Sequence, residues 1–138
     1  MVKKILFVCK FNRFRSKVAE AYFNKINKNK NIAVKSAGLF AGSYPLDSQQ
    51  VKLAKKFGIK IKKKPRAMSA KLLSKINKII IVADDVPKNL FLFKGKYLQE
   101  VTIWKIKDDL RGNEQTIEKI IKQIMLRVDK LNKGLNKK

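Results

Sequence analysis

A single cysteine and an arginine stand where the first apolar run of the chain gives way to a helical pattern. Cys9 follows the apolar residues Ile5–Val8, and five residues separate it from Arg15. A loop of this length can wrap a tetrahedral anion, because successive backbone N–H groups point inward and the following helix adds the positive end of its dipole. The planar guanidinium of Arg15 can hold two oxygens of such an anion. The same field favours the thiolate form of Cys9, which is an activated nucleophile beneath a bound phosphate.

The other residues of this loop suit an anion site. Asn12 tolerates the left-handed backbone conformation that a tight loop needs, and the hydroxyl of Ser16 can donate to the thiolate or cap the helix. Another interpretation is open, because a cysteine at the end of a strand is most often a small buried hydrophobe. The order of strand, loop, arginine, serine and helix favours the anion loop. Its candidate binding residues are Lys10, Phe11, Asn12, Arg13, Phe14 and Ser16.

Cleavage of a phosphate ester also requires a proton for the leaving oxygen. The chain has no histidine, so a carboxylic acid would have to supply this proton. Asp108 and Asp109 follow the apolar run Val101–Trp104, and either is a candidate. The simpler alternative is that both are solvated aspartates of a loop, without a role in catalysis.

The remaining pattern predicts the elements that would position these residues. Short, largely β-branched apolar runs predict buried strands, at Ile5–Val8, Ile32–Val34, Ile79–Val82 and Val101–Trp104. Apolar residues at helical spacing predict helices that begin near Arg15, at caps on Asp47 and Ser69, and near Ile117, with Gly58 ending the second. The charged run Lys60–Arg66 is expected to be an edge or a loop. Alternating strands and helices predict an α/β fold with a parallel sheet, and a ligand beyond the carboxyl ends of its strands.

Length and composition predict a single domain over residues 1–138. No repeat or linker divides the sequence, and its longest apolar runs have five residues, far short of a membrane span. With one cysteine and no histidine, the chain offers neither an internal disulfide nor the commonest metal ligand. We therefore expect a cytoplasmic, metal-free protein.

The formal net charge of +24 has two interpretations. Summed positive potential attracts polyanions, so a nucleic-acid partner is possible. The basic residues, however, are mostly lysines spread along the whole chain, without the clustered patch that is typical of a nucleic-acid binder. The pattern favours a solubilising surface, which would also steer anionic substrates toward the protein.

The segment Ile5–Ser16, followed by Ala19 and Glu20, resembles the signature of the low-molecular-weight protein tyrosine phosphatases. That signature is an apolar strand, the pattern Cys-x-Gly-Asn-x-Cys-Arg-Ser and a helix with Ala-Glu. The resemblance covers nearly the whole chain and implies a four-stranded parallel sheet with helices on both faces and the phosphatase loop after the first strand. Similar positions further along are Ser36-Ala37-Gly38, Phe57-Gly58-Ile59, Arg66, Asp84, and Asp108 with Gly112.

The resemblance implies a cysteine-dependent phosphatase that hydrolyses phosphate monoesters, including protein phosphotyrosine, through a thiophosphate intermediate and without a cofactor. Cys9 would be the nucleophile, Arg15 would bind the phosphate, and Ser36 would support the loop through Asn12. The family pattern Asp-Pro-x-x-Gly places the acid at Asp108. The alternatives are an arsenate reductase that uses external thiols, because its relay version needs two further cysteines, and a non-catalytic protein that binds anions or nucleic acid.

Several positions depart from the family pattern. Phe11 replaces a glycine and would narrow the mouth of the site or form its wall, and Phe14 replaces a cysteine. Lys63 replaces a histidine in the support of the loop. Leu110 and Arg111 replace aromatic residues that stack on phosphotyrosine, and Arg111 with Arg13 would form a rim that attracts a more highly charged anion.

Overall fold

The computed structural model describes residues 3–40, 45–61, 64–91, 100–108 and 111–136. A parallel sheet with the strand order β2-β1-β3-β4 forms its centre. The strands are β1 (Lys3–Cys9), β2 (Ile32–Gly38), β3 (Lys78–Val82) and β4 (Glu100–Trp104). The helices are α1 (Arg15–Ile26), α2 (Ser48–Lys56), α3 (Ala70–Leu73), the 3-10 helix η1 (Lys88–Phe91) and α4 (Glu114–Leu135).

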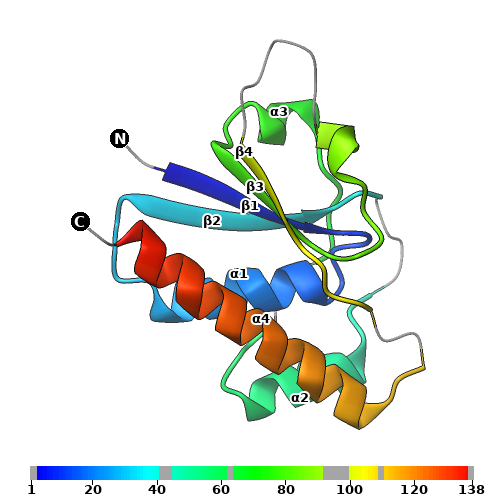
Figure 1. The fold of residues 1–138 in the computed structure, drawn as a ribbon. Helices are drawn as coiled ribbons and strands as arrows, with labels where there is room; N and C mark the ends of the chain where they lie inside the picture. Colours follow the sequence, from blue (N-terminus) through cyan, green and yellow to red (C-terminus); the bar gives the residue numbers. More distant parts are fainter. Residues whose placement is uncertain (1–2, 41–44, 62–63, 92–99, 109–110, 137–138) are drawn as a thin grey trace.

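Alternate residues of the central strand β1 enter two separate hydrophobic clusters. Ile5 and Phe7 pack with residues of α1, α2 and α4, whereas Leu6 and Val8 pack with residues of α3 and η1. Figure 1 shows the same division, with α1, α2 and α4 on one side of the sheet and the short α3 on the other. The prediction of a four-stranded parallel sheet covered on both faces is confirmed.

The helix caps agree with the sequence pattern. The carboxylate of Asp47 accepts a hydrogen bond from the Gln49 N–H at the start of α2, and the hydroxyl of Ser69 accepts one from Leu72 at the start of α3. Gly58 ends the α2 segment with a φ of +74°, a conformation that favours glycine. None of the helices among the described residues combines the length and the apolar character needed to cross a membrane.

The observed strands are longer than the predicted ones, and β2 differs most. It continues beyond Val34 to Gly38 and is buried over its last three residues. Within the run Lys60–Arg66, Ile61 is buried, and Ala67 just beyond it forms an isolated parallel bridge to Gly38. The Gly38 N–H also donates to the Arg66 carbonyl, so the last residue of the run lies at the free edge of β2, which agrees with the predicted edge or loop.

One polar contact joins α1 to α4 across the larger cluster. The hydroxyl of Tyr22 donates to the Asp129 carboxylate at 2.8 Å. Burial, together with this carboxylate, raises the pKa of Tyr22 above its ordinary value of 10.0. The folded state therefore favours the neutral phenol, so this contribution to stability is present below pH 10 and is lost as the pH rises through the raised pKa.

We expect Tyr22→Phe to lower the free energy of unfolding by about 1 kcal/mol at neutral pH, because the hydrogen bond to Asp129 is lost. The difference between the original protein and the variant should shrink between about pH 8 and about pH 11, where the phenol ionises. Urea denaturation at both pH values measures this difference in the free energy of unfolding. The same difference at both pH values would contradict a stabilising role of the neutral Tyr22 phenol.

Candidate active site

The loop from Lys10 to Phe14 turns directly from the end of β1 into α1. Asn12 has a φ of +56°, as predicted, and among the described residues other than glycine it alone has a positive φ. Gly38 at the end of β2 lies so close to the loop that a Cβ there would come within 2.6 Å of the Phe11 carbonyl carbon. The Leu39 N–H donates to the Lys10 carbonyl at 2.8 Å. The end of β2 thus fixes the path of the loop backbone.

The side chain of Asn12 holds the loop from inside the protein. It is fully buried, and its amide nitrogen donates to the hydroxyls of Ser16 at 2.7 Å and Ser36 at 3.0 Å. Its amide oxygen accepts a hydrogen bond from the Arg66 N–H at 3.0 Å. The Ser36 hydroxyl in turn donates to the Glu20 carboxylate at 2.6 Å. Asn12 and Ser36 therefore form the predicted hydrogen-bonded pair, and Ser36 is bonded to Glu20 as well.

The thiol of Cys9 lies at the base of the loop and is only 2% exposed. Its sulfur is 3.0 Å from the Ser16 hydroxyl. Because Ser16 also accepts a hydrogen bond from Asn12, its own hydrogen is free to point at the sulfur. In that orientation the hydroxyl would donate to the sulfur, which is one of the two interactions expected for Ser16.

The start of α1 differs from the starts of the other α-helices. Asp47, Ser69 and Asn113 cap α2, α3 and α4 with their side chains, whereas the residue before α1 is Phe14 and provides no side-chain cap. The first turn of α1 carries no acidic residue. Its N–H groups therefore have no competing side-chain cap and can serve a bound anion.

Arg15 is 2% exposed and is held from several sides. One terminal nitrogen donates to the Ile106 carbonyl at 2.9 Å. The other donates to the Asp85 carboxylate at 3.1 Å and lies 3.7 Å from Asp108 Oδ2. Asp84 is also near, at 3.8 Å. These carboxylates follow β3 and β4, so three neighbouring strands contribute to the placement of one guanidinium.

A cavity of about 290 Å³ brings the predicted catalytic residues together. Cys9, Arg15 and Asp108 all line it. Of the six predicted binding residues, Phe11, Arg13 and Phe14 line it, whereas Asn12 and Ser16 are buried beside it and Lys10 extends its ammonium group over the Phe11 ring. Lys10, Asn12 and Ser16 would therefore bind an anion through their backbone N–H groups. Phe11 forms a wall of the cavity, as expected.

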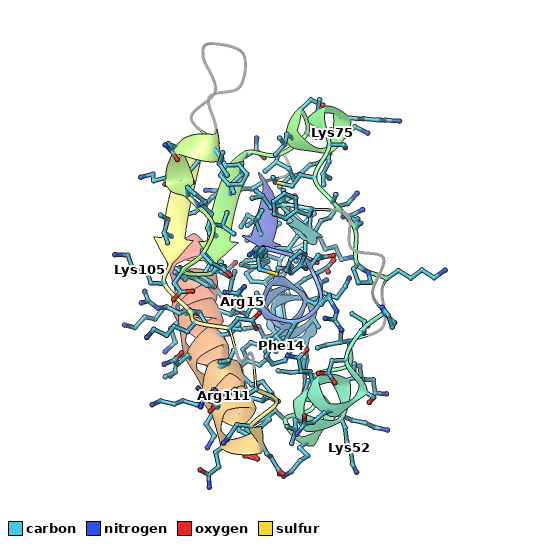
Figure 2. All side chains as sticks on the ribbon, turned by 90° about the vertical axis from the view of Figure 1, so that its right-hand side faces the viewer. Phe14, Arg15, Lys52, Lys75, Lys105 and Arg111 are labelled. Atoms are coloured by element: carbon cyan, nitrogen blue, oxygen red, sulfur yellow. The ribbon has the colours of Figure 1, made fainter. Side chains whose placement is uncertain are left out.

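The two arginines of the predicted rim differ in their position relative to the cavity. Arg13 lines the cavity, and its Nε donates to the Pro45 carbonyl at 2.9 Å. Arg111 is exposed and does not line the cavity. Figure 2 shows Phe14 and Arg15 near the middle of the face around the loop, with Arg111 below them. Lys63, Asp109 and Leu110, also considered in the sequence, lie outside the described residues.

The sequence alone does not identify Asp85, Asp47 or Gln50 as residues of the site, and it indicates Gly112 only through the family pattern. Asp85 binds Arg15, and Asp47, Gln50 and Gly112 line the cavity. The sequence pattern predicts only a helix cap at Asp47, and it gives no indication of the direction in which Asp47 and Gln50 face. Asp85 is the third residue after β3, at the end of the sheet where the rule for parallel sheets places ligands, but this position does not indicate that it pairs with Arg15. Among the described residues, no group of three His, Cys, Asp or Glu side chains is arranged to hold a metal ion.

The contacts of Asn12 lead to a prediction about the loop. Asn12→Ala should lower the free energy of unfolding by about 2–4 kcal/mol, because it leaves buried polar groups unpaired and puts alanine at a positive φ. Asn12→Gly should regain about 1 kcal/mol of this loss, since glycine adopts that conformation without strain. Chemical denaturation measures both, with the exposed Asn31→Ala as control. Equal stability of Asn12→Ala and Asn31→Ala would contradict the structural role.

The model for the low molecular weight phosphotyrosine protein phosphatases matches residues 4–138. A search of curated sequences gives no match.

Solved structures are similar over nearly the full chain. An arsenate reductase from Archaeoglobus fulgidus is 27% identical, with a TM-score of 0.73 over 93% of this chain and 98% of its own. A low-molecular-weight protein tyrosine phosphatase from T. tengcongensis is 24% identical, with a TM-score of 0.83 over 96% and 99%. The arginine phosphatase YwlE from Geobacillus stearothermophilus is 19% identical, with a TM-score of 0.77 over 96% and 92%. These similarities and the family match lead to one conclusion: the chain belongs to the low-molecular-weight phosphotyrosine protein phosphatase family.

Proposed function

We propose that the protein is a cysteine-dependent phosphatase that hydrolyses phosphate monoesters through a thiophosphate intermediate. The observation that carries this proposal is the cavity lined by a thiol, a guanidinium and a carboxyl group, from Cys9, Arg15 and Asp108. A thiol can attack phosphorus, a guanidinium can bind its oxygens, and a carboxyl group can protonate a leaving oxygen.

In the first step, the Cys9 thiolate attacks phosphorus and forms an S–P bond while the P–O bond to the leaving group breaks. Asp108, in its acid form, gives its proton to the leaving oxygen, so an alcohol departs. Arg15, the loop N–H groups and the start of α1 bind the equatorial oxygens of the phosphoryl group during the transfer. Asp85 keeps the guanidinium of Arg15 at the cavity through its 3.1 Å contact.

In the second step, a water molecule attacks phosphorus and the S–P bond breaks. The Asp108 carboxylate takes a proton from this water, so the acid form is restored and inorganic phosphate is released. The Ser16 hydroxyl, 3.0 Å from the sulfur, stabilises Cys9 as the leaving thiolate. An active-site phosphoserine in a mutant of the YwlE arginine phosphatase is in line with a phosphorylated intermediate on this fold.

Cys9→Ser tests the nucleophile. We expect the original protein to hydrolyse p-nitrophenyl phosphate and to be inhibited by vanadate, and Cys9→Ser to lose this turnover. The variant should still bind inorganic phosphate, because Arg15 and the loop N–H groups remain, and calorimetry can measure that binding. Absence of turnover by the original protein with several phosphoesters, or undiminished turnover by the variant, would contradict the proposal.

Asp108→Asn tests the acid. Turnover of phenyl phosphate should fall by roughly 10²–10⁴-fold, because the poor leaving group requires a proton. Asp47→Asn is a matched control, since Asp47 lines the same cavity and asparagine caps helices as well as aspartate does. Asp109→Asn addresses the alternative acid. An unchanged turnover rate in Asp108→Asn, together with a lowered rate in Asp109→Asn, would assign the role of acid to Asp109.

Arsenate reduction is the second candidate, and the similarity to the Archaeoglobus fulgidus arsenate reductase favours it. Arsenate has the shape and charge of phosphate and would occupy the same loop. Cys9 is the only cysteine of the chain, so external thiols would have to supply the two electrons. Incubation with arsenate and glutathione distinguishes the candidates: formation of arsenite without phosphoester turnover would favour the reductase.

A further inference from the structure

Two exposed aromatic rings lie together beside the candidate active site. Among the described residues, four large hydrophobic side chains are exposed: Phe11, Phe40, Leu90 and Leu126. The rings of Phe11 and Phe40 are 6.0 Å apart between centroids and tilted by 40°. Phe11 is 37% exposed and Phe40 52%. We call this pair the aromatic ledge.

Backbone hydrogen bonds fix the ledge in place. The Phe40 N–H donates to the Lys10 carbonyl at 3.1 Å, so the segment after β2 lies along the loop after β1. The Lys10 ammonium lies over the Phe11 ring, 5.4 Å from its centroid, in a cation–π contact. The same backbone contacts therefore position the loop and the two rings, so both rings are exposed at a fixed place beside the cavity.

The two rings have different positions relative to the cavity. Phe11 lines the cavity, whereas Phe40 does not. A group bonded to a phosphate at Cys9 would pass Phe11 as it leaves the cavity, and only a more distant part of the substrate would reach Phe40. The 6.0 Å between the rings is close to the distance over which an extended peptide advances by two residues, about 6.6 Å.

We propose that the aromatic ledge is a subsite for an apolar side chain within two positions of the phosphorylated residue of a protein substrate, with Phe40 as the specificity-determining residue. The inference rests on the proposed phosphatase function and adds a preference for the neighbouring sequence. Such a peptide matches the site in two ways: its apolar side chain covers exposed rings, and its phosphate enters a loop that carries Arg13 and Arg15.

The experiment compares two phosphotyrosine peptides that differ only in the residues flanking the phosphotyrosine, phenylalanine in one and serine in the other. The original protein should have a kcat/KM roughly 5- to 20-fold higher for the phenylalanine peptide, mainly through KM, because aromatic packing favours its binding. Phe40→Ser should remove this preference. It should leave p-nitrophenyl phosphate turnover unchanged, since that substrate is too short to reach Phe40.

Two further variants separate a local role of Phe40 from a general loss of apolar surface. Leu126→Ser changes an exposed apolar residue on α4 and should keep the preference, and Phe40→Leu should restore most of it. Equal kcat/KM for both peptides in the original protein, or a preference that survives Phe40→Ser, would overturn the inference. Absence of turnover with p-nitrophenyl phosphate in the original protein would instead count against the proposed phosphatase function.

Discussion

The buried amide of Asn12 is the interaction on which the site depends. Its hydrogen bonds reach β2 through Ser36, α1 through Ser16, and the segment beside β2 through Arg66. Since the amide is fully buried, each bond has low competition from water. A single side chain of the loop is thus hydrogen-bonded to three other parts of the chain that surround it. The positive φ of Asn12 lets the backbone N–H groups of the loop turn toward a common point.

Electrostatics around the loop combine a positive centre with acidic neighbours. The uncapped start of α1 and Arg15 provide the positive charge, and Asp84, Asp85 and Asp108 surround the guanidinium. The three carboxylates hold Arg15 in one orientation before any substrate binds. This reduces the side-chain entropy that is lost on binding. Lys52, Lys75 and Lys105 lie at the outer edges of this face, away from Arg15 (Figure 2). The residues of the loop therefore indicate the chemistry of the site more specifically than the net charge of +24 does.

Sequence predicted the fold well because the strands are apolar runs and the helices have clear periodicity. The predicted β2 ends too early because Ser36 and Gly38 are not apolar. Their burial depends on hydrogen bonds and on close backbone contact with the loop. The grouping of Cys9, Arg15 and Asp108 was predictable from local order and family spacing. The role of Asp85 was not, because a carboxylate in a loop has the same sequence signal whether it is solvated or paired with a distant arginine.

Phe14 occupies the loop position just before Arg15 and packs into the larger hydrophobic cluster, only 3% exposed. An aromatic ring at this point anchors the start of α1 but supplies no thiol, and Cys9 is the only cysteine of the chain. Oxidation of Cys9 to a sulfenic acid therefore has no intramolecular thiol with which to condense, and a disulfide requires a thiol from another molecule. Without such a thiol, further oxidation to the sulfinic acid is irreversible for a sulfur of this kind. Recovery of the protein from oxidants consequently depends on the concentration of small thiols around it.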